Sequence, residues 1–266
     1  MENRSMKVDS GHPLHSDRPP ALGPDVTDAD HSALLSSLGR LVRGLSLIFW
    51  GLPIALVVCV QSAKGDWFRP LGVVPPIIAT GLLFYGVLLL GGFQPQERPW
   101  VAVLDRARLV ALVNLGLAPF LYWWNRVPSH PFLTGMVEVL MLTGMIFLIL
   151  LNPLLRRLTA MLPDEALRAE TRLFTSFNRT ILLLVFGLIA GYLISIRIDP
   201  SLPDKFIGWL FQVSPLPQSL NAIFYIIDRN GPLLLLFVLL VPVAMTMALV
   251  WKVKEVILAS VFGPDH

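Results

Sequence analysis

The chain has 266 residues, of which 55% are hydrophobic and 15% are charged, and its mean hydropathy is +0.67. Soluble domains usually carry about 25% charged residues, so this composition argues against an ordinary soluble domain. The net charge is only +3, and the basic residues flank apolar runs instead of gathering on one face, which argues against a nucleic acid as partner.

The first 35 residues contain four prolines and charges of both signs, without the apolar core that a signal peptide requires. Such a composition is typical of disorder. We therefore expect residues 1–35 to form a disordered polar tail in the cytoplasm. The first apolar segment would then act as an uncleaved signal anchor.

Six apolar segments follow, each near the roughly 20 residues that a helix needs to cross a bilayer core about 30 Å thick. They cover about residues 45–61, 71–92, 109–124, 131–152, 180–196 and 232–251. The segment at 109–124 is short for a span. We predict an all-α polytopic membrane bundle of six transmembrane helices over residues 36–256, with a short C-terminal tail at 257–266.

The basic residues predict the orientation of this bundle. With the N-terminus inside, the inner connections hold twelve Lys and Arg residues and the outer connections hold six. Because basic residues concentrate in cytoplasmic loops, this bias predicts that both termini are cytoplasmic in a cell membrane, inner or plasma. Trp67, Trp123 and Trp251 fall at predicted helix ends, as an aromatic belt requires.

Two connections are longer than simple turns. Around residues 163–177, acids precede bases at helical spacing, which predicts a helix lying on the inner surface. The outer connection at 198–231 contains an apolar stretch at 206–227, which is broken by Gly208, Pro215 and Pro217. We interpret it as one or two interfacial helices, and a re-entrant segment is the alternative.

A weak repeat opens the first, third and fifth segments, where an arginine precedes a Gly-Leu pair by eight residues. These candidate packing or repeat positions are Arg43 and Gly51, Arg108 and Gly116, and Arg179 and Gly187. One interpretation is three tandem helix hairpins, as parallel repeats occur in transporters. The other is chance in a chain rich in glycine and leucine. In either case, glycines let membrane helices approach closely.

Glu138 is the one acid well inside a predicted span, and a carboxylate at that depth is a functional hypothesis because burying it is costly. Asn114 and Arg126 are its candidate partners. One hypothesis is a proton or cation site containing Glu138 and Asn114. The other is a hydrogen-bonded carboxyl that holds helices together. Asn114 and Asn152 are expected to form hydrogen bonds between helices.

No motif predicts a catalytic residue, a cofactor or a metal site. There is no phosphate-binding loop, no His-Glu-x-x-His and no nucleophile elbow. The five histidines fall in predicted tails and one loop, and the single cysteine, Cys59, cannot form an internal disulfide.

These observations favour a non-catalytic component or scaffold of a membrane complex. Its partners would be the lipid bilayer and other membrane subunits or further copies of the chain. The alternative is a small-solute or ion transporter with a pathway near Glu138, Asn114 and the kinks expected at Pro53 and Pro119. An intramembrane enzyme is the third hypothesis, and it has the least support, because no nucleophile–base pair can be assembled from the spans.

Overall fold

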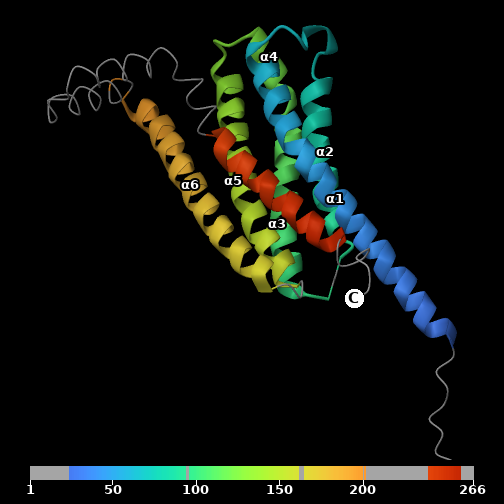
Figure 1. Cartoon of the computed structure of the whole chain (residues 1–266). Helices are drawn as coiled ribbons and strands as arrows, with labels where there is room; N and C mark the ends of the chain where they lie inside the picture. Colours follow the sequence, from blue (N-terminus) through green and yellow to red (C-terminus); the bar gives the residue numbers. More distant parts are fainter. Residues whose placement is uncertain (1–23, 94–95, 162–164, 200, 202–238, 259–266) are drawn as a thin grey trace, which may run out of the picture. The chain divides into compact units, whose positions relative to one another are not determined.

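The described residues of the computed structural model are 24–93, 96–161, 165–199, 201 and 239–258, and they form helices and no strand (Figure 1). The all-α prediction is therefore confirmed for this part of the chain. The chain divides into two units, residues 1–36 and 37–266. The first unit contributes the first turns of α1, and all packing described below belongs to the second.

α1 is one helix from Pro24 to Lys64. Disorder was expected as far as residue 35, but residues 24–35 are helical, whereas residues 1–23 lie outside the described part. A proline at the first helical position, followed by acids such as Asp25 and Asp28, favours a helix start here. Pro53 lies inside α1 without ending it.

Glycines set the contact between α1 and α2 (Val74–Leu90), which follows the short 3-10 helix η1 (Arg69–Leu71). A Cβ added at Gly44 would lie 2.9 Å from the carbonyl oxygen of Gly86. One added at Gly51 would lie 2.8 Å from Cδ2 of Leu83. The two helices can approach this closely because neither glycine carries a side chain.

The third predicted span, 109–124, falls on two helices, α3 (Arg98–Leu117) and α4 (Pro119–Arg126). Pro119 has no N–H, so the helical hydrogen bond to the carbonyl four residues earlier is missing. The amide of Ala118 still donates to the carbonyl of Asn114 at 3.0 Å. The kink expected at Pro119 is confirmed, because the helical path divides there into α3 and α4.

α5 runs from Pro131 to Ala160 and α6 from Glu165 to Ile198. The helix expected at 163–177 is confirmed from Glu165 onward, but its separation from the span at 180–196 is wrong, because α6 continues through both regions. Residues 163 and 164 lie outside the described part. Thr171, Thr175 and Asn178 are buried, and their spacing of three to four residues places them on one face of α6. This part of α6 packs against protein along that face.

The last helix of the described part covers residues 239–258 and runs obliquely across other helices in Figure 1. Its buried side chains Val250 and Val253 join one hydrophobic core with residues of α1, α2, α3 and α5. Trp251 contacts Phe49 of α1, with ring centroids 5.5 Å apart. Of the sixth predicted span, residues 232–238 lie outside the described part, as does the apolar stretch at 206–227 of the outer connection.

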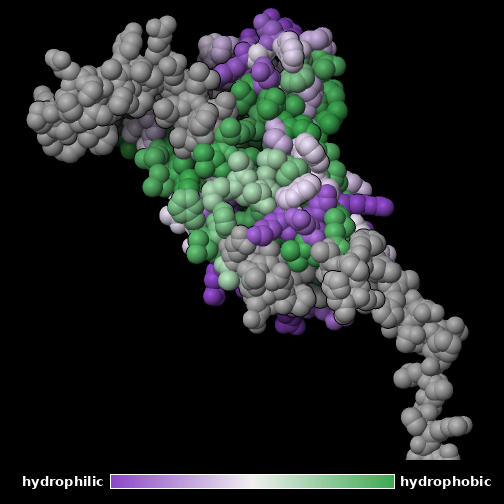
Figure 2. Space-filling model, in the orientation of Figure 1, coloured by the Kyte–Doolittle hydropathy of each residue, from purple (hydrophilic) through white to green (hydrophobic). Residues whose placement is uncertain are grey.

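Among the described residues, three helical stretches are long and apolar enough to cross a membrane. They are Ser36–Lys64 of α1, Pro131–Ala160 (α5) and Thr171–Ile198 of α6. α2 is a shorter apolar helix. Hydrophobic residues cover much of the face shown in Figure 2, which is compatible with insertion into a membrane.

Candidate functional site

α5 and α6 run antiparallel, so the first turns of α5 lie beside the last turns of α6 (Figure 1). Met145, Val185 and Ile189 are buried between them, with Met141 and Ile181 packed around these three. The residues of each helix recur at a spacing of four, which forms one apolar stripe on each helix. These stripes bring the Glu138 end of α5 to the Arg197 end of α6.

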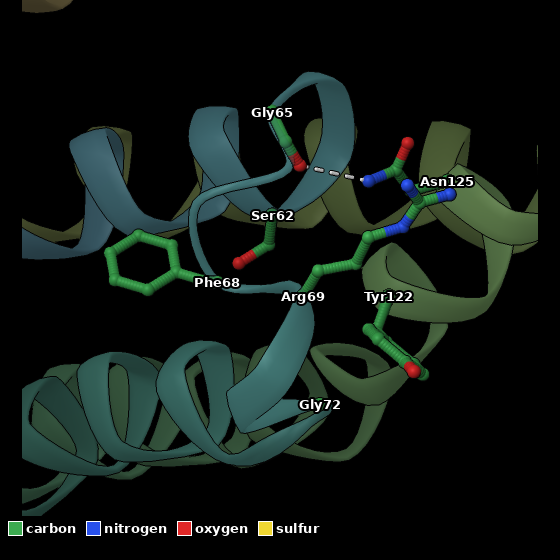
Figure 3. A pocket seen from close by; sticks show the side chains of 7 residues that line it. All are labelled: Ser62, Gly65, Phe68, Arg69, Gly72, Tyr122 and Asn125. Carbon is green, nitrogen blue, oxygen red and sulfur yellow. Dashed lines mark hydrogen bonds between the residues drawn. The ribbon is translucent and has the colours of Figure 1, made fainter.

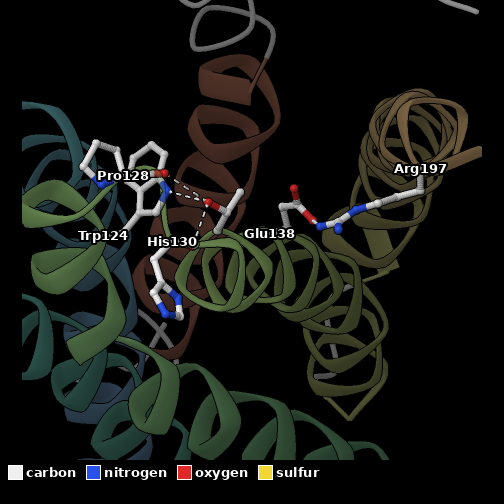
Figure 4. A network of polar contacts seen from close by, with 6 residues as sticks. Trp124, Pro128, His130, Glu138 and Arg197 are labelled. Carbon is white, nitrogen blue, oxygen red and sulfur yellow. Dashed lines mark hydrogen bonds and ion pairs between the residues drawn. The ribbon is translucent and has the colours of Figure 1, made fainter. Parts of the chain in front are cut away.

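Glu138 forms an ion pair with Arg197 across this contact (Figure 4). Nη2 of Arg197 donates to Oε2 of Glu138 at 2.8 Å. The Glu138 side chain is 27% exposed and that of Arg197 is 61% exposed. Because a charge-assisted bond of this length is favourable, Glu138 is held on the surface of the α5–α6 pair.

The residues expected to partner Glu138 have other environments. Asn114 is buried on α3, and its Oδ1 has no hydrogen-bond partner within the described part. Arg126 lies at the end of α4, where its Nη2 donates to the hydroxyl of Tyr122 at 3.0 Å. The structure therefore brings Glu138 to Arg197 and does not bring it to Asn114 or Arg126.

An open groove of about 300 Å³ runs beside the ion pair. Glu138 and Arg197 are its charged lining residues. The other lining residues are apolar: Val139 and Leu142 of α5, and Ala190, Leu193, Ile194 and Ile198 of α6. The groove is thus an apolar trough between two helices, with charges among its lining residues.

The three repeat glycines have different environments. Gly51 is buried against Leu83, whereas Gly116 and Gly187 are exposed. At these two positions an added Cβ would meet no atom of another described element within 4 Å. Close packing at the repeat positions therefore holds for Gly51 and not for the other two within the described part. Gly44 and Gly86 pack against each other, and neither of them belongs to the repeat.

The repeat arginines also differ in their contacts. Arg43 and Arg179 are exposed. Arg108 pairs with Asp105 at 3.1 Å, and its Nη2 lies 3.5 Å from the carbonyl oxygen of Leu88 near the C-terminus of α2. A cation at a helix C-terminus is favourable because the carbonyl ends carry partial negative charge. A Cβ at Gly91 would collide with the Arg108 guanidinium, so Gly91 makes room for it.

A buried polar cluster joins α5, α6 and the helix 239–258, and the sequence named only one of its members, Asn152, as a helix-linking residue. The Asn178 amide donates to Oδ1 of Asn152 at 3.1 Å and to Oγ1 of Thr246 at 2.9 Å. Thr246 in turn donates to the carbonyl of Pro242 at 2.8 Å. All three side chains are buried. Asn152 was expected to donate a hydrogen bond between helices; it accepts one instead, and its own amide donates within α5, to the carbonyl of Leu148 at 3.0 Å.

A second, smaller cavity lies where α1, η1 and α4 meet, and Figure 3 shows the seven residues that line it. The Asn125 amide donates to the carbonyl of Gly65 at 3.0 Å, which ties α4 to the end of α1. Oγ of Ser62 is buried without a hydrogen-bond partner in the described part. The cavity volume of about 10 Å³ is the room of one water molecule.

Among the described residues, no three His, Cys, Asp or Glu side chains lie close enough together to hold a metal ion. Comparison with protein families, curated proteins and solved structures finds no match to this chain.

Proposed function

We propose that this chain is an integral protein of a cell membrane with six spanning helices and cytoplasmic termini. In this proposal it is a non-catalytic component or scaffold of a membrane complex, whose partners are other membrane subunits or further copies of the chain. The three apolar stretches support the membrane placement. α2, the α3–α4 pair and the helix that contains 239–258 would supply the other three spans.

The scaffold proposal rests on the contacts that polar side chains make between these helices. Glu138 pairs with Arg197, and Asn178 bonds Asn152 and Thr246. Both sets of contacts join one helix to another. Groups that bond each other serve packing, whereas a transport pathway needs polar groups that face a polar cavity.

The topology is tested by fusing reporters to the full chain at Gly65, Gln96 and Ser129, residues that follow the first, second and third proposed spans. We expect these positions to report outside, inside and outside, because the basic residues are concentrated in the proposed inner connections. A cytoplasmic signal at Gly65, or an external one at Gln96, would contradict six spans.

The scaffold proposal is tested by extraction of the tagged chain in a mild detergent. We expect the chain to elute in a complex of fixed stoichiometry, either with itself or with other membrane subunits. Elution as a monomer, together with solute uptake when the chain is reconstituted in vesicles, would contradict the proposal.

The alternative, a transporter, has one observation in its favour: Glu138 lies in a groove that opens at the surface. It requires that uptake into vesicles be lost in Glu138→Gln and retained in Arg126→Gln, which removes a charge outside the groove. The apolar lining of the groove favours the scaffold proposal, because a hydrated solute would lose its hydrogen bonds there.

A further inference from the structure

The groove between α5 and α6 is an apolar hollow on two of the helices that are apolar enough to cross a membrane. Val139, Ile194 and Ile198 in its wall are exposed within the described part. In the membrane placement proposed above, a wall of this kind faces the lipid. If the groove were empty, the atoms that line it would lose dispersion contacts, so an apolar occupant is favoured.

The dimensions of the groove suit a lipid chain. Its lining on α6 extends from Ala190 to Ile198, which corresponds to about 12 Å at 1.5 Å per residue. The hydrocarbon region of one leaflet is roughly 15 Å thick, half of the bilayer core. A single acyl chain lying along α6 would therefore follow the groove over most of a leaflet.

The charged end of the groove suits a zwitterionic headgroup. Arg197 uses Nη2 to contact Glu138, and a guanidinium has five N–H donors, so donors remain for a phosphate oxygen. Oε1 of Glu138 is left to accept from an ammonium group, since the ion pair uses Oε2. Together the two side chains are neutral, so they match a lipid that carries both charges better than an anionic one.

We propose that this groove binds one phospholipid of the phosphatidylethanolamine class. One of its two acyl chains lies along Leu142, Ala190 and Ile194. Its phosphate contacts Arg197, and its ammonium contacts Glu138. The primary ammonium donates hydrogen bonds that a choline headgroup cannot donate. This inference rests on the proposed membrane placement of α5 and α6.

Native mass spectrometry of the full chain in a mild detergent tests the headgroup contacts. Phosphatidylethanolamine, phosphatidylcholine and phosphatidylglycerol with identical acyl chains are added in turn. We expect one adduct, formed most readily with phosphatidylethanolamine, and a loss of about fivefold in Arg197→Gln, as for one basic contact to a lipid surface. Arg126→Gln removes an arginine outside the groove and should leave the adduct unchanged.

A second pair of variants tests the acyl chain. Ala190→Phe places a ring in the groove and should reduce binding of all three lipids. Leu188→Phe adds the same ring to an exposed position of α6 that does not line the groove, and it should bind lipid as the wild type does. Arg197→Lys keeps the charge and should keep the adduct, which separates loss of the contact from misfolding.

Equal adducts in Arg197→Gln and Arg126→Gln, or no effect of Ala190→Phe, would overturn the proposal. Equal retention of the three lipids would overturn the headgroup assignment. Dimers cross-linked through a cysteine at position 190 would assign the groove to a second copy of the chain instead.

Washing the membranes in carbonate separates the lipid-site proposal from the proposed membrane placement. If the chain stays in the membrane without a site-dependent adduct, only the lipid site fails; if it washes off, the membrane placement fails.

Discussion

At the scale of single residues, Asn178 is a polar side chain of α6 that is held on the inside of the helix packing. It is fully buried, and its amide nitrogen donates to acceptors on two other helices. Its Oδ1 is buried and has no hydrogen-bond partner within the described part. Because a buried group without a partner lowers stability, the two donated bonds must outweigh this defect for the cluster to be favourable.

We expect Asn178→Asp to destabilise the fold by roughly 1–3 kcal/mol, because the carboxylate cannot donate to Asn152 and Thr246 and leaves both acceptors without their bond. Thermal unfolding of the purified chain in detergent measures the effect. The control is Ser176→Ala, an exposed position on the same helix. Equal unfolding temperatures for the two variants would mean that the cluster does not stabilise the fold.

At the scale of helices, the crossing of α1 and α2 depends on backbone proximity. The atom that a Cβ at Gly44 would meet first is a backbone oxygen, that of Gly86, and backbone cannot rotate away as a side chain can. Gly116 on α3 is the opposite case, because an added Cβ would meet no atom of another described element within 4 Å. The same substitution therefore has opposite expected effects at these two glycines.

We expect Gly44→Ala to lower the unfolding temperature, because α1 and α2 must move apart to admit the methyl group. Gly116→Ala should leave it unchanged or raise it, since alanine is favoured over glycine inside a helix by up to about 1 kcal/mol. Both variants are compared with the wild type by thermal unfolding monitored by circular dichroism. A loss of stability in Gly116→Ala alone would contradict this account of the crossing.

At the scale of the whole molecule, large apolar side chains stay exposed within the described part. On α6 they include Leu184, Leu188 and Tyr192. In water such a surface would be unfavourable, because the free energy falls when apolar area is removed from water. A bilayer provides that environment, so the proposed membrane placement accounts for the exposed face of α6.

We expect a nitroxide label at Leu188 to collide with dissolved oxygen far more than with a water-soluble nickel reagent, because oxygen concentrates in lipid. The label is attached to Leu188→Cys in a Cys59→Ala background, measured in vesicles. Leu182, which is buried on the same helix, is the control and should be protected from both reagents. A label at position 188 that the nickel reagent reaches readily would contradict a lipid-facing α6.

Composition and periodicity were sufficient to predict the helical class, the apolar stretches in α1, α5 and α6, and the kink at Pro119. These features depend on local chemistry, namely side-chain hydropathy and the missing N–H of proline. The start of α1 at Pro24 was missed because a segment rich in proline and acids resembles a disordered tail. The continuity of α6 was missed because acids and bases at helical spacing also fit a surface helix.

The sequence by itself determined that Glu138 is an acid within an apolar segment, but only the tertiary structure decided that Arg197 is its partner. The two residues lie on helices whose antiparallel packing brings distant positions together. In the same way, Asn152 was identified without Asn178 and Thr246, and Gly51 without Gly44 and Gly86. Hydropathy determines which segments form apolar helices, whereas the choice of facing side chains depends on how the helices pack, which no single segment encodes.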